Sequence, residues 1–375
     1  MKKVIVFFGT RPEAIKLAPV IDALIADKNF NTLVCSTGQH KEMLQQVVDF
    51  FRIPVHFMLD VMEENQQLSG LTAKLLVKIS ELLLEQRPDV VVVQGDTTTT
   101  FAASLAAYYC KIKVVHVEAG LRTYNKFSPF PEELNRTMTT RIADFHYPPT
   151  EHARQNLLRE GVPAENMLVT GNTVIDALFL GLKKIARAIP QGIAEHKLQD
   201  IKNFILVTMH RRENHGEGVR NICLAIKRIV DETGVPVIFP VHLNPNVKDM
   251  VHELLGGQPL IHLVPPFAYP EFLWLLNNAF LILTDSGGVQ EEAPSLGKPV
   301  LLLRDTSERP EAIDAGTVLK VGSDPELIYT EAITLLTNHE AYEAMAMKSN
   351  PYGDGQAAGR IVKSMTSPRP SPRRG

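Results

Sequence analysis

The sequence is poor in features that would each mark a particular class of protein. Its three cysteines, Cys35, Cys110 and Cys223, are scattered along 375 residues, so neither a disulfide framework nor a CxxC zinc pair is indicated. No apolar run reaches the ~18 residues that a membrane span needs. The net charge is only −3, which gives no reason to expect nucleic acid or an anionic membrane as a partner. We expect reduced thiols and no metal.

Several familiar motifs are missing as well. There is no Walker A loop, no HExxH and no GxSxG. The segment GDGQAA at 353–358 matches a dinucleotide-binding pattern, but no strand is expected before it. NAD is therefore not expected to bind in the Rossmann manner, and no cofactor is predicted. The first residues lead directly into a strand without a signal-peptide pattern, so a cytoplasmic protein is expected.

What the chain does contain is a regular alternation of short apolar runs and helical patterns. The run Val90–Val93 is apolar on both faces, as parallel strands buried under helices are. Strand–helix alternation predicts an α/β protein with doubly wound parallel sheets. The expected strands are Val4–Phe8, Leu33–Ser36, Val90–Val93, Val114–Val117, Leu168–Thr170, Phe204–Thr208, Val235–Val241, Ile261–Val264, Phe280–Leu283 and Val300–Leu303.

The alternation is interrupted between about Leu180 and Lys202, where charge is higher and no strand is expected. We predict two Rossmann-like lobes, at residues 1–180 and 181–350, followed by a helix at 351–366. The Pro- and Arg-rich segment 367–375 is expected to be disordered. Doubly wound sheets bind ligands at the carboxyl ends of their strands, so an interlobe active-site cleft is expected.

Three acids are candidates for proton chemistry in the first lobe. Asp96 and Glu118 directly follow expected strands, and Glu132 begins an expected helix after Pro131. Each has an ordinary explanation: Asp96 could cap a helix, and Glu132 could pair with Arg136 one turn later. Their convergence on one sheet edge favours proton abstraction and return, or stabilisation of an oxocarbenium ion.

Cations and a histidine extend this candidate site. Arg11 and Lys16 lie at a helix start, where acids are normally preferred; a solvated loop is the alternative. His210 ends another expected strand, with Arg211 beside it. It could serve a leaving diphosphate as an acid or a hydrogen-bond donor, or it could be an ordinary loop histidine.

The most specific segment is TDSGG at 284–288, between an apolar strand and a short helix. After Ser286, Gly287 and Gly288 allow a ligand to approach the backbone, and a helix start suits a diphosphate. Glu291 and Glu292, placed in about the first helical turn, favour a sugar-nucleotide site over an ordinary turn, because Glu292 could accept hydrogen bonds from ribose hydroxyls. Arg309 is placed near this loop by strand order.

These motifs together resemble a known family, the non-hydrolysing UDP-N-acetylglucosamine 2-epimerases. The resemblance runs from Val4 to about Arg360, and it is carried by GTRPEAIK, GDTTTT, HVEAGLRT, PEELNR, GNTVIDAL, HRREN, PVHLNPNV, TDSGG followed by QEEAPSLGKPVL and RDTSERPEA, and NPYGDGQA. It implies a two-lobed GT-B-like fold whose C-terminal helix returns to the first lobe. It also implies a homodimer, and a role in supplying cell-surface polysaccharide synthesis.

The resemblance implies reversible inversion at C2 of UDP-N-acetylglucosamine (UDP-GlcNAc), giving UDP-N-acetylmannosamine (UDP-ManNAc). UDP would leave by anti elimination, giving a 2-acetamidoglucal, and would then add back; no nicotinamide is used. By motif, Asp96, Glu118 and Glu132 would transfer protons or stabilise the cation, and His210 would support the diphosphate. Substrate or UDP would be bound by Arg11, Lys16, Arg136, Phe272, Ser286, Gly287, Gly288, Glu292 and Arg309.

The chain departs from the family pattern in two places. It reads FAYPEF at 267–272 where relatives often have QEYLPF, which removes a glutamine contact to the nucleotide. Some bacterial relatives also have a second UDP-GlcNAc site that activates the enzyme. Gln39, Glu132, Arg211 and His242 match that pattern, but an arginine used in some relatives is replaced within ENQQ at 64–67.

Three other functions remain as alternatives. A hydrolysing 2-epimerase would carry different first-lobe loops, with His-Gly-Gly-Glu in place of the segment that begins at Glu118. A GT-B glycosyltransferase would use the three acids to bind an acceptor. A catalytically silent nucleotide-sugar sensor would have no reason to keep the acids together with His210.

Overall fold

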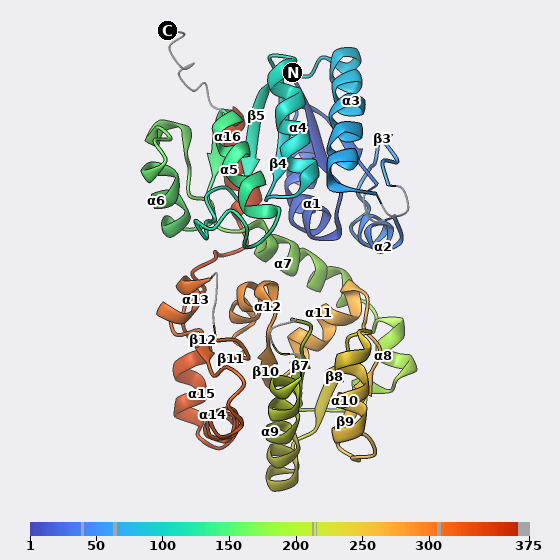
Figure 1. The fold of residues 1–375 in the computed structure, drawn as a ribbon, viewed down its shortest axis with the longest axis vertical. Helices are drawn as coiled ribbons and strands as arrows, with labels where there is room; N and C mark the ends of the chain where they lie inside the picture. Colours follow the sequence, from blue (N-terminus) through green and yellow to red (C-terminus); the bar gives the residue numbers. More distant parts are fainter. Residues whose placement is uncertain (39–40, 63–65, 212–213, 215, 306–308, 367–375) are drawn as a thin grey trace. The chain divides into compact units, whose positions relative to one another are not determined.

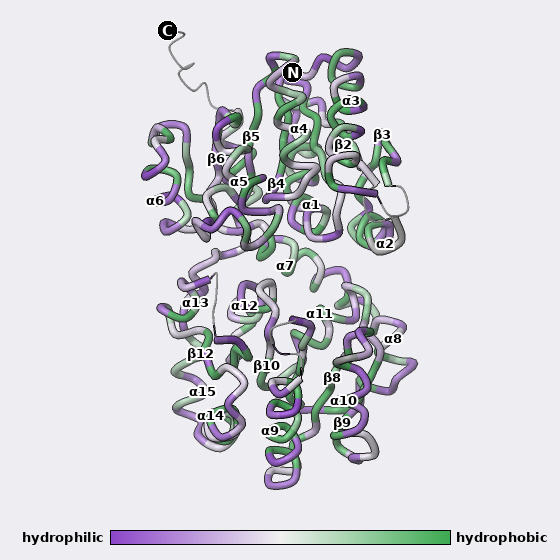
Figure 2. Tube along the Cα trace, in the orientation of Figure 1, coloured by the Kyte–Doolittle hydropathy of each residue, from purple (hydrophilic) through white to green (hydrophobic). Residues whose placement is uncertain are grey.

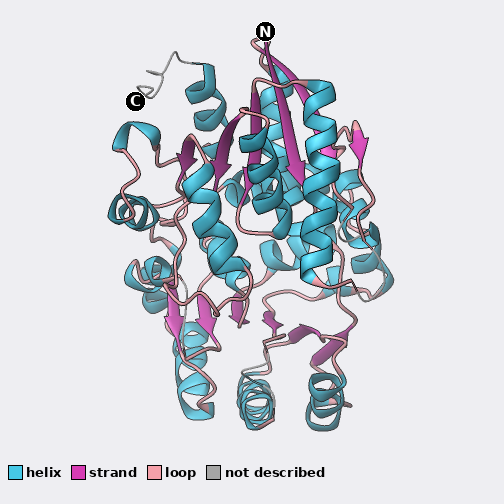
Figure 3. Ribbon diagram, turned by 45° about the horizontal axis from the view of Figure 1, so that its top comes forward, coloured by secondary structure: helices cyan, strands magenta, loops and turns pink. Residues whose placement is uncertain are grey.

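The computed structural model describes residues 1–38, 41–62, 66–211, 214, 216–305 and 309–366. The expectation for 367–375 lies outside them. The chain forms two compact units, one comprising Met1–Leu180 with the segment from Tyr352 onward, the other Gly181–Pro351. Figure 1 shows the elements of each unit, and Figure 3 shows strands flanked by helices. Among the described residues, no helix is both long and apolar enough to cross a bilayer.

Unit 1 contains a six-stranded sheet in the order β3-β2-β1-β4-β5-β6, with every neighbouring pair parallel. Because the chain winds outward from β1 in both directions, the strand order reverses between β1 and β4, and ligands bind at such a point in doubly wound sheets. The strands are β1 (Lys2–Phe8), β2 (Phe30–Ser36), β3 (Phe57–Met58), β4 (Val90–Gln94), β5 (Lys113–Val117) and β6 (Phe145–Tyr147).

Helices cover both faces of this sheet. One layer contains α3 (Leu68–Gln86), α4 (Thr98–Tyr109) and α5 (Glu132–Ile142); the other contains α1 (Arg11–Ala26), α2 (Lys41–Phe51) and α16 (Ala357–Thr366). The remaining helices of the unit are α6 (Glu151–Arg159), η1 (Ala164–Asn166) and α7 (Thr173–Ile185), which runs into unit 2. Residues 4–8 and 91–93 are fully buried, which explains their continuous apolar character.

The C-terminal helix α16 packs against α1, far away in sequence. Its start is fixed by Asp176 of α7, whose carboxylate accepts the backbone N–H groups of Ala357 and Ala358 at 3.1 and 2.9 Å. Burial raises the pKa of Asp176 and outweighs these hydrogen bonds, which lower it.

Unit 2 repeats the topology, with the all-parallel order β12-β11-β10-β7-β8-β9. Its order reverses between β7 and β10. The strands are β7 (Ile205–Thr208), β8 (Val237–Pro240), β9 (Ile261–Val264), β10 (Leu281–Thr284), β11 (Val300–Leu302) and β12 (Val318–Lys320).

One face of the second sheet packs against α9 (Glu217–Thr233), α10 (Pro245–Leu255) and α14 (Pro325–Thr337), whose apolar residues form a single core with the strands. Figure 2 shows the alternation of apolar and polar residues along α9, as expected for a half-buried helix. The other helices are α8 (Gln191–Glu195), η2 (Leu198–Asp200), α11 (Tyr269–Asn278), α12 (Gly287–Glu292), η4 (Ala293–Leu296), α13 (Pro310–Asp314) and α15 (His339–Ala346).

One expected strand is wrong and three strands were not expected. Leu168–Thr170 is irregular. Met167, just before it, makes an isolated bridge with His146, and the backbone N–H groups of Leu168 and Thr170 donate to the carbonyl groups of His146 and Pro148. The true edge strand of this sheet is β6. The unexpected strands β3, β6 and β12 have only two or three residues each, which is too short for a recognisable period.

Candidate functional site

The carboxyl edge of the first sheet is held together by a buried acid, Glu13. Its Oε2 accepts hydrogen bonds from the backbone N–H groups of Gly9 and Thr10 and from the Thr10 hydroxyl, at 2.8–3.0 Å. Its Oε1 accepts from the hydroxyls of Thr97 and Thr100 at 2.7 and 3.2 Å. The loops after β1 and β4 are therefore joined at the point where the strand order reverses. Burial raises the pKa of Glu13, against the lowering effect of these hydrogen bonds.

Glu118 follows β5 at the same edge. Its carboxylate contacts the Lys16 ammonium at 2.6 and 2.7 Å, accepts a hydrogen bond from the Gln94 amide, and accepts another from Asn172 at 3.3 Å. The residue has φ +59°, a left-handed conformation that is uncommon outside glycine. Such strained residues persist where their surroundings fix them, as these three partners do. The carboxylate is thus held in one orientation beside a cation.

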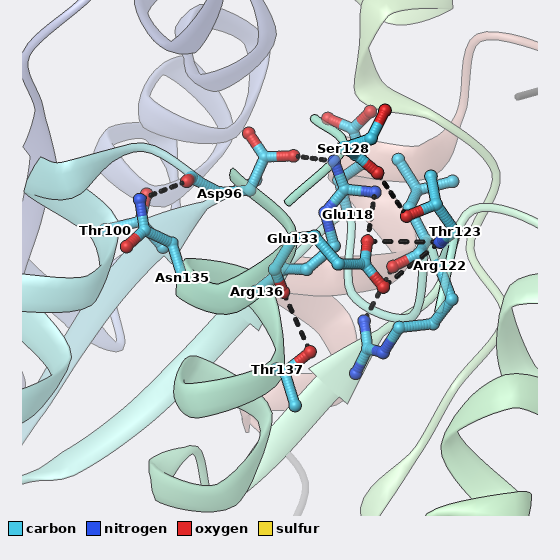
Figure 4. A network of polar contacts seen from close by, with 12 residues as sticks. Asp96, Thr100, Glu118, Arg122, Thr123, Ser128, Glu133, Asn135, Arg136 and Thr137 are labelled. Atoms are coloured by element: carbon cyan, nitrogen blue, oxygen red, sulfur yellow. Dashed lines mark hydrogen bonds and ion pairs between the residues drawn. The ribbon is translucent and has the colours of Figure 1, made fainter. Parts of the chain in front are cut away.

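Asp96 follows β4, the neighbouring strand, so it lies at the same sheet edge as Glu118. Its side chain is 26% exposed, and its Oδ2 lies 2.6 Å from Nη2 of Arg136 on α5. The adjacent Asn135 donates from Nδ2 to the Asp96 backbone carbonyl at 3.0 Å. Figure 4 shows Asp96 facing these two residues. Helix α5 therefore holds both the main chain and the carboxylate of Asp96.

The helical pair that Glu132 could have formed with Arg136 is not observed among the described residues. Arg136 contacts Asp96 and, at 3.4 Å, Glu133. Buried Glu133 also accepts the backbone N–H groups of Thr123 and Tyr124, which fixes the loop that leads away from Glu118. Glu132 is half-buried at the first position of α5. Arg11, also half-buried, is the first residue of α1, at the same edge as the other cation, Lys16.

Two buried histidines lie behind this edge, His116 on β5 and His146 on β6, at paired positions. Burial lowers the pKa of His116 to about 3 and that of His146 to about 4. Both pKa values lie below that of an unfolded histidine. Between pH 6.5 and these lowered pKa values, the two histidines are protonated in the unfolded chain but not in the folded one. The free energy of unfolding therefore falls as pH falls.

We expect the free energy of unfolding to drop by about 2 kcal/mol per histidine between neutral pH and pH 5. The raised pKa of Glu13 acts in the opposite direction, so total stability alone is not diagnostic. The melting temperature should be measured from pH 7.5 to 5 for the natural chain and for His146→Gln. The variant should show a shallower decline; equal slopes would contradict a neutral buried histidine.

In unit 2, the loops after β7 and β10 are joined by fully buried Asp285. Its carboxylate accepts the backbone N–H groups of His210 and Arg211 and the Asn214 amide, at 2.8–3.1 Å. It also lies 3.0 Å from Nδ1 of His210. Burial alone would raise the pKa of Asp285, but the hydrogen bond and charge of His210 and the backbone donors hold it below its ordinary value.

The contact with Asp285 assigns a different role to each ring nitrogen of His210. A hydrogen bond to a carboxylate places a proton on Nδ1, so Nε2 is the nitrogen that remains for a ligand. The His210 side chain is 40% exposed, in contrast to its fully buried partner. This arrangement is that of a histidine oriented by an acid, the pattern used in general acid–base sites.

The TDSGG loop carries a second set of fixed contacts. Arg309 donates from Nε to Glu291 at 2.6 Å, and its guanidinium crosses Gly287 so closely that a Cβ there would lie 2.5 Å from Nη1. Gly287 is thus needed for the approach of Arg309. Glu291 and Glu292 are the last two residues of α12, whereas the sequence suggested that they lie in about its first turn.

The remaining nucleotide candidates lie around this loop. Ser286 precedes α12, and its hydroxyl makes no capping hydrogen bond. Glu292 accepts a hydrogen bond from the Tyr269 hydroxyl at 3.4 Å, which links the loop to α11. Phe272, one turn along α11, is half-buried. A Cβ at Gly288 would lie 3.9 Å from Oε2 of Glu292 and 4.0 Å from the Ser286 hydroxyl, which is ordinary van der Waals contact.

The residues that match a second site are only partly placed. Gln39 lies outside the described residues. Arg211 donates its backbone N–H to Asp285, and exposed His242 has its ring 6.4 Å from that of His210. Within the described ranges, no three His, Cys, Asp or Glu side chains cluster as a metal site requires.

Sequence reasoning missed several residues that organise these loops. Gln94, Asn135 and Asn172 contact the candidate residues Glu118 and Asp96, and Glu13 joins the loops after β1 and β4. No sequence motif marks these contacts, because most of them link segments that are distant in sequence. Asp285 lies inside the TDSGG segment and could have been noticed. An acid at the end of one strand commonly orients a histidine at the end of the neighbouring strand.

Known proteins resemble the chain over nearly its whole length. A family model described as UDP-N-acetylglucosamine 2-epimerase matches residues 22–366. The UDP-N-acetylglucosamine 2-epimerase of Salmonella typhimurium is 50% identical over 374 residues, covering 98% of this chain and 100% of the relative. The protein of the same name from Escherichia coli K12 is 49% identical over 372 residues, with 98% and 99% covered.

Solved structures of UDP-N-acetylglucosamine 2-epimerases are also similar to this chain. The UDP-GlcNAc 2-epimerase from Neisseria meningitidis, bound to UDP-GlcNAc, has a TM-score of 0.86 and 48% identity, covering 97% of this chain and 99% of that one. A putative UDP-N-acetylglucosamine 2-epimerase from Listeria monocytogenes has a TM-score of 0.90 and 45% identity, covering 97% and 95%. The expected fold class, two Rossmann-like lobes of GT-B type, is confirmed.

Proposed function

The chain belongs to the UDP-N-acetylglucosamine 2-epimerase family, and from that membership we propose that it interconverts UDP-GlcNAc and UDP-ManNAc without hydrolysing them. The observation that supports this most directly is the pair of acids at the ends of neighbouring strands. Glu118 and Asp96 are each held against a cation, Lys16 and Arg136. Inversion at carbon requires a proton to leave one face and return to the other, which suits more than one acid–base group.

We propose that the reaction proceeds by elimination. A carboxylate takes the C2 proton, the C–H electron pair forms the C1=C2 double bond, and the C1–O bond breaks with its electron pair on the diphosphate of UDP. Positive charge that develops at C1 is stabilised by the remaining carboxylates among Asp96, Glu118 and Glu132. UDP then adds back to C1 while C2 is protonated on the opposite face. No electrons are gained or lost, so no redox cofactor is needed.

We assign the nucleotide to unit 2. Ser286, Gly287 and Gly288 would offer backbone and hydroxyl groups to the diphosphate, with Arg309 supplying positive charge. Glu292 would accept ribose hydroxyls, and Phe272 would lie near the base. His210, oriented by Asp285, would present Nε2 to the leaving diphosphate. Arg11, together with Lys16 and Arg136, would bind substrate from unit 1.

Proton NMR of the purified chain with UDP-GlcNAc in D₂O tests this function. We expect a mixture of UDP-GlcNAc and UDP-ManNAc with deuterium at C2. Free N-acetylmannosamine and UDP would show a hydrolysing enzyme instead. An unchanged spectrum, followed by transfer of GlcNAc to an added acceptor, would show a glycosyltransferase.

We further propose that the enzyme is cytoplasmic and supplies polysaccharide synthesis. We also propose that UDP-GlcNAc activates it, and a sigmoidal dependence of rate on UDP-GlcNAc concentration would reveal this activation.

We also propose a homodimer, through a surface that we call the α3–α4 face. It carries large exposed hydrophobic residues on two helices that pack side by side (Figure 2): Val77, Leu84, Tyr108 and Tyr109. Val77 and Leu84 are seven residues apart, so they share one side of α3. Exposed apolar patches of this kind mark protein–protein contacts, and a twofold dimer uses the same patch on both copies.

Replacing Val77 and Leu84 together by lysine should convert the dimer to a monomer, because two charges would be buried in an apolar interface. Light scattering coupled to gel filtration gives the mass directly. Leu224→Lys, at an exposed position of α9 in unit 2, is the matched control and should leave the mass unchanged. A double variant that stays dimeric would place the interface elsewhere.

A further inference from the structure

The turn that presents Asp96 is fixed at three successive carbonyl groups. The Gln94 carbonyl accepts from the Thr100 hydroxyl at 2.6 Å, the Gly95 carbonyl from His116 Nε2 at 2.7 Å, and the Asp96 carbonyl from Asn135 Nδ2 at 3.0 Å. These donors come from α4, β5 and α5. Gln94 ends β4, and Gly95 and Asp96 lie beyond it in the turn, so side chains from three different elements pair with these carbonyl groups.

The last two contacts lie on either side of Asp96. The Gly95 carbonyl belongs to the peptide group that precedes Asp96, and the Asp96 carbonyl belongs to the one that follows it. Hydrogen bonds to both peptide groups restrict rotation of the Asp96 backbone, and Arg136, beside Asn135, holds the carboxylate. Gly95 itself has φ +71° and open space around its Cβ position, so glycine is needed here for conformation.

His116 has a feature that packing alone does not explain. Because Nε2 faces a carbonyl, it must carry the proton, which leaves Nδ1 as an acceptor. That Nδ1 is buried without a hydrogen-bond partner, as is Nδ1 of His146, so the contact with the Gly95 carbonyl is what distinguishes His116. An unsatisfied buried polar atom destabilises the fold, and an apolar ring of similar shape would avoid this cost. Burial also lowers the pKa of His116 to about 3, so the ring donates without adding a charge near Asp96.

We infer that His116 and Asn135 are positioning residues, which hold the Asp96 carboxylate in the orientation needed for proton transfer or cation stabilisation. This rests on the proposed role of Asp96 in epimerisation. Neither residue touches the substrate in this mechanism; each acts through a peptide group of Asp96. Misplacement of a catalytic group by about 1 Å can lower the rate about 100-fold, so fixing two peptide planes has a measurable effect.

The test uses the full chain and compares turnover with nucleotide affinity. His116→Phe keeps the ring shape and loses the donor, and should lower kcat about 10- to 100-fold. His116→Gln can place an amide N–H where Nε2 lies, and should recover most of that loss. The Kd of UDP, which unit 2 is proposed to bind, should stay within about threefold in both. Asn135→Ala provides a second, independent route to the same loss.

His146→Phe is the matched control, since His146 is a buried histidine paired with His116 across the sheet but does not contact the Asp96 turn. It should keep kcat within about threefold. A double variant decides whether His116 acts through Asp96. In an Asp96→Asn background, His116→Phe should lower kcat little further, because effects of residues that act as a unit are not additive.

The outcomes separate this inference from the proposed function. If Asp96→Asn is slow while His116→Phe and Asn135→Ala are normal, the positioning roles are overturned and the role of Asp96 stands. If His116→Phe lowers kcat by the same factor with and without the Asp96 carboxylate, His116 does not act through Asp96 and the inference fails. Normal turnover of Asp96→Asn would overturn both.

Discussion

Glu118→Gln should reduce epimerisation by at least ~100-fold while UDP still binds, as expected when an acid–base group is lost. The amide has nearly the same shape as the carboxylate, but every hydrogen-bond partner of Glu118 is a donor, so its NH2 group loses the contacts on one side. It cannot accept the C2 proton or stabilise positive charge at C1. Turnover and C2 deuterium incorporation should fall together, and the Kd of UDP should not change.

A control separates this chemical effect from the loss of a buried ion pair. Lys16 loses its charged partner in the variant, but its side chain is 15% exposed and can turn toward water. Glu160→Gln breaks the comparably buried pair between Arg122 and Glu160, also in unit 1. It should lower the melting temperature without reducing kcat more than about threefold. Near-normal turnover of Glu118→Gln would remove Glu118 from the mechanism.

The topology of both sheets was largely predictable because central parallel strands have a strong signature. Strands such as β1 and β4 are buried on both faces, and their apolar runs are continuous. The edge strands β3, β6 and β12 have two or three residues and carry no such pattern. Their positions depend on neighbouring strands; β6, for example, is paired only with β5 in its sheet.

The types of residue in the site were predictable, but their partners were not. Helical spacing allowed Arg136 to pair with Glu132, whereas it contacts Asp96, forty residues away in sequence, and Glu133. A spacing rule describes an isolated helix, and the tertiary contact with the turn after β4 overrides it. Glu13 shows the same limitation. It resembles an ordinary first-turn acid, yet it joins two loops through five donors.

The pairing of His210 with Asp285 leads to the second large expected effect. Asp285→Asn should lower kcat about 100-fold or more, because every group around this carboxylate is a donor. An amide N–H group would face these donors, and His210 would lose the acceptor that keeps the proton on Nδ1. Turnover should be measured with the Kd of UDP, since a disturbed loop could also affect nucleotide binding.

The same variant should change the acid stability of the chain. The pKa of Asp285 is held below its ordinary value, so its carboxylate stabilises the fold above the unfolded pKa, near 4. This contribution is lost as pH falls through the lower, folded pKa. Asp285→Asn should therefore melt at a lower temperature at pH 7, and the difference should shrink toward pH 3. Asp305→Asn, at an exposed acid after β11, should change neither property. Full turnover in Asp285→Asn would mean that His210 needs no such orientation.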